Sequence, residues 1–315
     1  MFDDLKESTL NRRTLLRSAG GFALGAGALG LLTGCGGDDN NGTSIPVQPG
    51  DASAVLNFAL NLEYLEAAYY LRAVGRSAEF TGNSGGGPEP IYPATAQVDF
   101  AGSPDVEAYA KEIAEDEFNH VKYLRTVLGA GAVATPKLDL KNSFTAVARA
   151  KGIVGPDQDF DPFSSPLAFV IGAFIFEDVG VTAYSGGARV LINGNVAVDT
   201  ILKAAGILAV EAYHAGLIRT FLYVHRNDPV ANFDVAGTVG AISQFRASLG
   251  GGKDQGIGPG SGNASNIVPA DDNSIAFERT TAEVINIVTA GGTEGDTTKK
   301  TGGFFPNGLN GAVVK

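Results

Sequence analysis

The chain has 315 residues, of which 44% are hydrophobic, and it carries a formal net charge of -11 with a pI near 4.7. This hydrophobic fraction supports a real core, in one large domain or two ordinary ones, and excludes a chain that is disordered throughout. The acidic balance argues against nucleic acid and anionic membrane surfaces as partners, because both would repel an acidic face. Small molecules, metal ions and other proteins remain as partner classes.

Residues 1–35 have the pattern of an export signal. Twin arginines, Arg12 and Arg13, precede an apolar run rich in glycine and alanine from Ser18 to Gly34, and Cys35 follows it. The segment resembles a bacterial twin-arginine signal peptide. A transmembrane helix is the weaker alternative, because the uncharged run has 17 residues, at the lower end of the roughly 17 to 25 that a span needs.

Cys35 is the only cysteine in the chain, which excludes an intramolecular disulfide. Residues 32–35, Leu-Thr-Gly-Cys, resemble a lipobox, which implies that Cys35 is lipidated and becomes the mature N-terminus. The protein would then be exported to the cell envelope or periplasm, touching a membrane only through its N-terminal lipid anchor. Alternatively, the cleavage site lies nearby and Cys35 is incidental. The polar, Gly/Asn-rich residues 36–50 predict a flexible tether.

Four long segments after the tether have the apolar spacing or composition of helices that pack together. Caps and stops such as Ser103, Gly129 and Ser165 mark several of their ends. The four predicted helices start near Asp51, run from about Pro104 to Leu128, start near Ser165, and run from about Val198 to His225. They predict an all-α four-helix bundle over residues 51–227 rather than an α/β sheet.

Three further segments lie between or after the four predicted helices. Residues 81–103 are too rich in proline and glycine for a helix, whereas Asn142 to Ala150 predicts a short surface helix. Residues 228–315 form a Gly/Asn/Ser-rich C-terminal extension with one helix expected between Ser274 and Ala290. Two phenylalanines near its end, Phe304 and Phe305, are expected to fold back onto the bundle.

The candidate functional residues lie in a sequence pattern that occurs twice. The pattern E-x-x-H-x-x-x-x-R-T-x-L occurs twice and uses two of the three histidines. A second pattern, a glutamate followed seven residues later by a tyrosine, precedes each copy. The chain is therefore two copies of a helix pair, and the duplicated positions are Glu63 and Tyr70, Glu117 and His120, Glu177 and Tyr184, and Glu211 and His214.

The spacing of these residues predicts a metal site. Residues three apart lie on one face of a helix, so each E-x-x-H places a carboxylate and an imidazole side by side. Two such helices and one glutamate from each of the other two supply four carboxylates and two imidazoles, a set suited to two iron or manganese ions. Four buried carboxylates would destabilise the fold by several kcal/mol unless protons or cations neutralised them.

Residues 51–227 resemble the ferritin-like superfamily. The matching motifs are VLNFALNLEYLEAAYYL, AEDEFNHV, FIFEDVGVTAY and ILAVEAYHAGLIR, with the terminal GGFFPNGLNG; they are similar to exported ferritin-like domain proteins related to plant desiccation-associated proteins. The resemblance implies a four-helix bundle with Tyr70 and Tyr184 hydrogen-bonded to ligand carboxylates. The metal ligands that it implies are Glu63, Glu117, His120, Glu177, Glu211 and His214.

Several assignments have alternatives. Glu66 lies one turn from Glu63 and could be the ligand of the first helix, although the match between the two Glu-x6-Tyr pairs favours Glu63. The two tyrosines could instead pack ordinarily with satisfied hydroxyls. We expect the remaining charged or polar neighbours to be solvated or ion-paired. These are Glu115, Asp116 and Asp178, the arginines Arg125 and Arg219 in structural salt bridges, and His225 on the surface.

Two functions fit this reading. The first is a stress-protection protein whose di-iron or di-manganese centre reacts with O2 or peroxide, as an oxidase, a peroxidase or a catalase-like enzyme. The second is a non-enzymatic envelope protein that protects during drying, with a structural metal or none. The sequence assigns no catalytic residue beyond the ligands.

Overall fold

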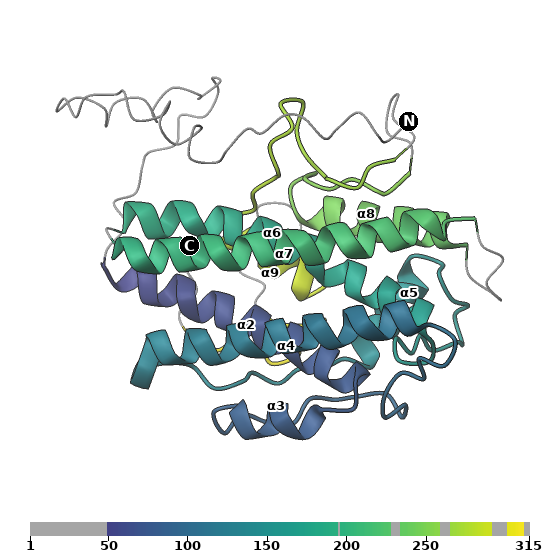
Figure 1. The fold of residues 1–315 in the computed structure, drawn as a ribbon, viewed down its shortest axis with the longest axis horizontal. Coiled ribbons are helices and arrows are strands. Elements are labelled where there is room, and N and C mark those ends of the chain that lie inside the picture. Colours follow the sequence, from purple (N-terminus) through teal and green to yellow (C-terminus); the bar gives the residue numbers. More distant parts are fainter. Residues whose placement is uncertain (1–48, 195, 228–233, 259–264, 292–300, 312–315) are drawn as a thin grey trace, which may run out of the picture. The chain divides into compact units, whose positions relative to one another are not determined.

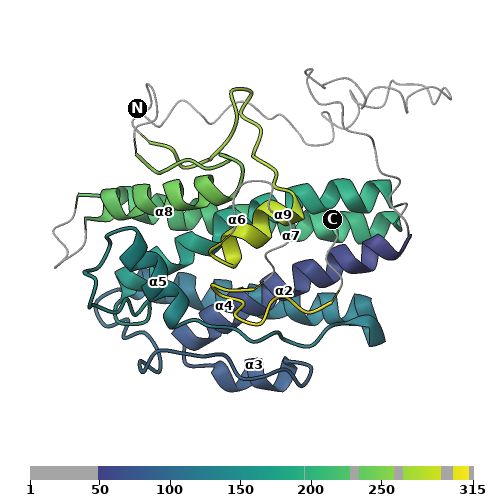
Figure 2. The same cartoon turned by 180° about the vertical axis from the view of Figure 1, so that it is seen from behind.

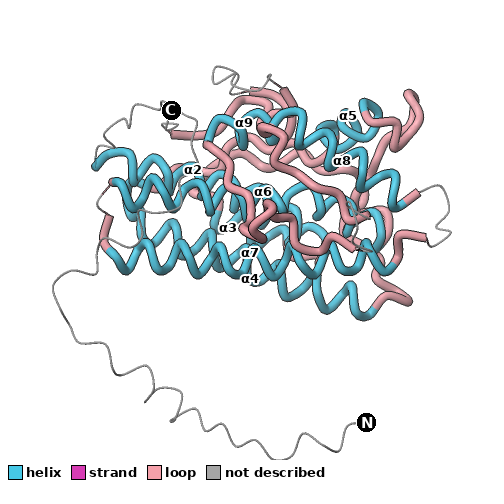
Figure 3. Tube along the Cα trace, turned by 90° about the horizontal axis from the view of Figure 1, so that it is seen from above, coloured by secondary structure: helices cyan, strands magenta, loops and turns pink. Residues whose placement is uncertain are grey.

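The computed structural model describes residues 49–194, 196–227, 234–258, 265–291 and 301–311, and within them every regular element is helical (Figure 3). The predicted all-α class is confirmed. Cys35, the predicted signal peptide and most of the predicted tether lie outside the described residues. The helices are α2 (Pro49–Ala73), α3 (Ser77–Asn83), α4 (Pro104–Leu128), α5 (Asn142–Ala150), α6 (Pro166–Asn193), α7 (Val198–Val224), α8 (Val235–Leu249) and α9 (Thr281–Val288), with a short 3-10 turn η2 (Gly129–Gly131) after α4.

The four long helices form two pairs, α2 with α4 and α6 with α7, and α2 also packs against α6 (Figure 1). The first pair is antiparallel. Asn57, near the start of α2, donates to the carbonyl of Gly131 just beyond the end of α4 at 3.0 Å. Tyr64, further along α2, accepts from Arg125 in the last turn of α4 at 2.5 Å. As the chain advances along α2, its partners lie progressively further back along α4, as antiparallel packing requires.

The arginine of each R-T-x-L segment ties together the helices of its own pair. Arg125 donates to the hydroxyl of Tyr64, the residue that follows Glu63. Arg219 donates to the carboxylate of Asp178, the residue that follows Glu177, at 2.7 Å. The expected salt bridge is thus present for Arg219. For Arg125 the partner is a phenol, because the second repeat has an aspartate where the first has a tyrosine.

Helix boundaries follow the sequence signals closely. α4 begins at Pro104 and ends at Leu128 as predicted, although the Ser103 side chain makes no capping hydrogen bond. The hydroxyl of Ser165 does cap α6, accepting from the backbone N–H of Ala168 at 3.2 Å. α5 also has the predicted bounds, but one face of it, including Phe144 and Val147, is buried. It is therefore part of the core rather than a surface helix.

The C-terminal extension contains two helices in its described part, where one was expected. The sequence does not predict α8, because its glycines, Gly237 and Gly240, lower intrinsic helix propensity. Its buried face, with Val239 and Ile242, is stabilised by packing on α6 and α7. α9 lies within the range predicted for the one expected helix, and Thr280, which the sequence offers with Thr281 as a cap, forms a capping box with Glu283 at its first turn.

The extension packs on the side of α6 and α2 that Figure 2 brings to the front, where α9 and the C-terminal segment are seen. Phe304 and Phe305 are buried. The ring of Phe304 lies 5.1 Å from that of Phe144 and 5.0 Å from that of Phe176. α6 and α7 are long and apolar enough to cross a membrane by length and composition, but α6 is almost wholly buried, as a core helix of a bundle is.

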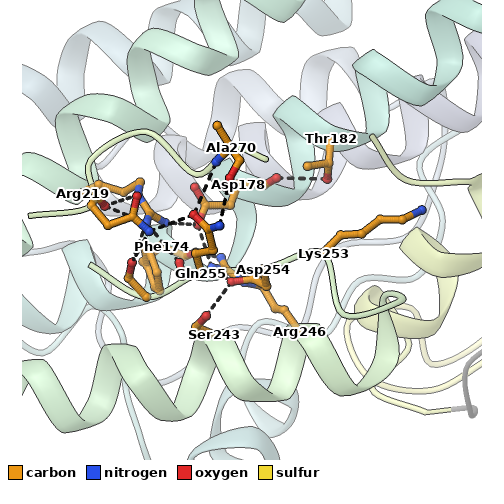
Figure 4. Close-up of polar contacts among 12 residues, drawn as sticks. Phe174, Asp178, Thr182, Arg219, Ser243, Arg246, Lys253, Asp254, Gln255 and Ala270 are labelled. Carbon is orange, nitrogen blue, oxygen red and sulfur yellow. Dashed lines mark hydrogen bonds and ion pairs between the residues drawn. The ribbon is translucent and has the colours of Figure 1, made fainter. Parts of the chain in front are cut away.

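A chain of buried charges joins the extension to the bundle (Figure 4). Asp178 accepts from Arg219 at 2.7 Å and from Arg246 of α8 at 2.6 Å. Asp254 accepts from Arg246 and from Arg279, each at 2.9 Å. All five side chains are buried. Buried ions are stable only when paired and hydrogen-bonded, so each member depends on the others.

The charge chain yields a stability prediction. Asp254→Asn leaves Arg246 and Arg279 short of a counter-charge inside the protein, so we expect the free energy of unfolding to fall by about 3–5 kcal/mol. Chemical denaturation followed by circular dichroism measures it. The matched control is Glu107→Gln, which breaks an exposed pair with Lys111 and should lower stability by about 0–1 kcal/mol. Equal losses in the two variants would contradict the structural role of the chain.

Candidate metal centre

The six predicted ligand residues come together in the middle of the bundle. One comes from each of α2 and α6, and two, on one face, from each of α4 and α7. All six are buried, the most exposed being His120 at 8%. They are Glu63 of α2, Glu117 and His120 of α4, Glu177 of α6, and Glu211 and His214 of α7.

The six residues form two overlapping groups that could each hold a metal ion. One group is Glu63, Glu117, His120 and Glu211; the other is Glu117, Glu177, Glu211 and His214. Within each group one ligand atom from every residue lies within 4.8 Å of the others. Glu117 and Glu211 belong to both groups, so their carboxylates lie where the two groups overlap. Each remaining glutamate is paired with one histidine.

Short contacts between imidazoles and carboxylates define the two halves. Nδ1 of His120 lies 3.2 Å from Oε2 of Glu63 and 3.4 Å from Oε2 of Glu117. Nδ1 of His214 lies 2.9 Å from Oε1 of Glu117 and 3.6 Å from Oε2 of Glu177. Glu117 therefore presents one oxygen to each histidine, as a bridging carboxylate would present one to each ion.

The two tyrosines brace the centre across the α2–α6 interface. Tyr70 of α2 donates its hydroxyl to Oε1 of Glu177, and Tyr184 of α6 donates to Oε1 of Glu63. Each tyrosine thus serves the glutamate of the opposite helix. The seven-residue spacing now has a structural reason, because antiparallel helices place each glutamate opposite the tyrosine two turns along the other. Burial, and then the nearby carboxylates, raise the pKa of both phenols well above normal, so both stay protonated donors.

The donor atoms that face inward fit a pair of cations. Eight buried atoms of the six residues lack a hydrogen-bond partner. They are both oxygens of Glu117 and Glu211, the Oε2 atoms of Glu63 and Glu177, and the Nδ1 atoms of His120 and His214. An unsatisfied buried polar group costs about 1–3 kcal/mol, and more if charged. Six oxygens and two imidazole nitrogens are a donor set that suits iron or manganese.

Protons neutralise part of the cluster when cations do not. Burial raises the pKa of Glu63 to about 7, although His120 opposes the shift. Burial also raises the pKa values of Glu177 and Glu211. Burial acts in the same direction on Glu117, but its two histidine neighbours outweigh it and hold that pKa well below normal. Cations that enter the centre must therefore displace protons.

Glu66 lies beside the centre but belongs to neither ligand group. It is buried, and burial raises its pKa well above normal, with Glu117 and Glu177 adding to the shift. The corresponding residue of the second repeat is Gly180. A Cβ atom there would lie 2.3 Å from Oε2 of Glu211 and 3.3 Å from Oε1 of Glu66, so the two carboxylates occupy the space that a side chain would need. The two halves of the centre are therefore not equivalent.

Asp116 is a part of the site that the sequence did not reveal. Its Oδ2 atom lies 3.2 Å from Nε2 of His214, where it holds the ring with Nδ1 directed at the centre. A carboxylate that orients a ligating histidine is a recurring arrangement in metal sites. The feature of the sequence that could have indicated it is that Asp116 directly precedes Glu117. The second repeat has Val210 at this position, which cannot do the same for His120. His225, by contrast, stacks on Phe221 away from the six, with ring centroids 4.2 Å apart.

Comparison with known proteins agrees with this architecture. A family model described as a ferritin-like domain matches residues 51–224. The ferritin-like catalase Nec2 of Nesocodon mauritianus is 28% identical over 276 residues, covering 83% of this chain and 84% of that protein. The desiccation-related protein PCC13-62 of Craterostigma plantagineum is 31% identical over 254 residues, covering 75% of this chain and 77% of that protein. No solved structure matches the chain significantly.

The protonation of the cluster predicts a pH dependence for metal binding. Below the Glu63 pKa of about 7 a proton occupies a carboxylate that a cation requires, and above it the carboxylate is free. Affinity for Mn(II) should therefore rise with pH, and binding should release protons. Titration calorimetry one pH unit below and one above that pKa, in buffers of different ionisation enthalpy, measures both effects. Equal affinity at the two pH values would contradict the prediction.

The contact between Asp116 and His214 predicts an effect on one half of the centre. Asp116→Asn weakens the acceptor that orients His214, so we expect affinity for one of two bound ions to fall about 10–100-fold. Competitive titration with a metal indicator measures it. The neighbouring Glu115→Gln, which alters only an exposed pair with Arg76, is the control and should leave affinity unchanged. A loss of equal size in both variants would argue against the orienting role.

Proposed function

The chain belongs to the ferritin-like domain family, and from the geometry of its centre we propose that it binds two iron or manganese ions and decomposes hydrogen peroxide. The observation that carries the proposal is the sharing of Glu117 and Glu211 between two carboxylate–histidine groups. Glutamates shared in this way would hold a pair of redox-active ions close together. The resemblance to a protein named ferritin-like catalase, over most of both chains, supports peroxide as the substrate.

The bound ions would supply a two-electron change: one peroxide molecule is reduced to two waters with two protons and two electrons, while another is oxidised to O2 and gives up the same number of each. The protein's own part is to position and protect. Tyr70 and Tyr184 hold one oxygen each of Glu177 and Glu63, which leaves the second oxygen of each facing inward. Asp116 orients His214. Burial raises the pKa of the Glu66 carboxyl group well above normal, which favours its protonated form beside the centre.

Apolar helices exclude bulk water from this site. α6 contributes Ile175, Phe176 and Val179 around the glutamates, and α2 contributes Leu62 and Leu65. A dry, closed centre strengthens every charge interaction inside it and limits side reactions of peroxide. The sequence features of residues 1–35 add a proposal on location: export by the twin-arginine route and a lipid anchor at Cys35 would place this activity in the cell envelope.

A second candidate function is structural. The resemblance to a desiccation-related protein favours a bundle that the metal stabilises but that turns over no substrate. In that case the cations would offset the burial of the four carboxylates and nothing more.

Metal analysis and a peroxide assay separate these functions. We expect about two iron or manganese ions per chain in the mature protein and O2 release from peroxide. Glu117→Ala, which removes a carboxylate common to both groups, should lose the metal pair and reduce turnover to that of metal-free protein. Glu115→Ala is the matched control and should behave as the unaltered chain.

Two outcomes would contradict different parts of the proposal. Two bound ions without peroxide turnover would contradict the catalase-like proposal and favour the structural function. No bound iron or manganese after loading with either would contradict the metal centre itself.

A further inference from the structure

A small apolar pocket lies between α2 and α6, next to the metal centre. Its walls include Val55, Phe58 and Leu62 of α2 and Ala183, Tyr184 and Leu191 of α6. The space inside has a volume of about 30 Å³. A water molecule needs about 10–15 Å³ on this measure, so the pocket has room for a molecule of two or three heavy atoms.

Tyr184 lines the pocket and also contacts a candidate ligand, so it connects the pocket with the centre. Leu62 directly precedes Glu63, and Tyr184 donates its hydroxyl to Oε1 of Glu63. From there the pocket follows α2 back to Val55, about 10 Å at a rise of 1.5 Å per residue. Gly187 of α6 lines this outer part, and a Cβ atom on it would lie 3.5 Å from Cγ1 of Val55. The absence of a side chain at residue 187 keeps this part open.

The lining selects against polar occupants. The wall has three polar side chains, and two of them already have partners: the hydroxyl of Tyr184 donates to Glu63, and the Arg279 guanidinium donates to Thr182 and Asp254. The third is Thr281. Water or peroxide would exchange several hydrogen bonds for those that the single Thr281 hydroxyl can offer, whereas an apolar diatomic molecule would lose none. Small apolar cavities in proteins stay dry and take up apolar gases such as xenon.

We propose that this pocket is a binding site for dioxygen, and that dioxygen formed at the centre leaves on the side of Tyr184. The inference rests on the proposed function, because O2 is the product of peroxide decomposition. The proposal accounts for the two contacts of Tyr184: its hydroxyl binds the Glu63 carboxylate, and the residue also lines the apolar pocket. An apolar site beside a dry centre separates the apolar product from the polar substrate.

The test uses crystals of the metal-loaded protein pressurised with xenon and, separately, with oxygen. We expect xenon and O2 density between Val55 and Tyr184 in the unaltered protein. Leu191→Ala enlarges the pocket and should raise xenon occupancy. Gly187→Val fills it and should abolish both ligands, while Gly206→Val, at an open position on α7, is the matched control and should bind as the unaltered chain does.

Turnover supplies the second readout. Gly187→Val should lower peroxide turnover several-fold with full metal content, and Gly206→Val should not. Absence of gas density in the unaltered protein would overturn the binding site, and unchanged turnover in a folded Gly187→Val protein with a filled pocket would overturn the exit route. Neither result affects metal content or peroxide decomposition by the unaltered protein, on which the proposed function depends, so failures of the two proposals are distinguishable.

Discussion

The burial of four carboxylates and two imidazoles inside an apolar bundle is the constraint on which the rest of this structure depends. Charges in such surroundings are tolerated only when other groups neutralise or coordinate them. The molecule meets part of this need internally, through imidazole–carboxylate contacts and carboxyl groups whose pKa values burial raises. Eight side-chain oxygen and nitrogen atoms of the six residues, among them atoms of these contacts, still have no hydrogen bond. These atoms could therefore bind cations, and the four long helices enclose them.

Duplication explains how four helices came to carry this set. Each helix pair contributes a glutamate from its first helix and a glutamate and a histidine from its second. The antiparallel contact of α2 with α6 then turns two separate Glu-x6-Tyr patterns into reciprocal hydrogen bonds. Each half braces the other, so neither pair holds a complete site alone.

The symmetry is broken at positions that bear on chemistry. Glu66 has a glycine as its counterpart, and Asp116 has a valine. One half therefore has a carboxylate behind its histidine. Between α2 and α6 lies an extra carboxyl group, that of Glu66, whose pKa burial raises, beside a glycine that leaves space for it. The repeated ligand residues therefore lie in asymmetric surroundings, with different proton-binding groups beside the two histidine–glutamate groups.

The C-terminal extension helps to hold the helices around the centre. Asp178, next to Glu177, is held by arginines from α7 and α8, and Arg279 both completes this buried charge chain and lines the apolar pocket. Phe304 seals the bundle between Phe144 and Phe176. α6, the helix that carries Glu177, is thereby held in place by contacts from outside the bundle as well as from within it.

The sequence by itself determined the helical class, the bounds of α4 and α5, and the six residues that meet at the centre. These are local properties: a cap, a proline or a three-residue spacing acts within one helix. Only the tertiary structure decided that each tyrosine serves the opposite helix, that Asp116 supports His214, that α8 forms despite its glycines, and that Asp178 is buried among arginines. Those outcomes depend on which helices face each other and in what register, and the packing of the whole core sets that choice.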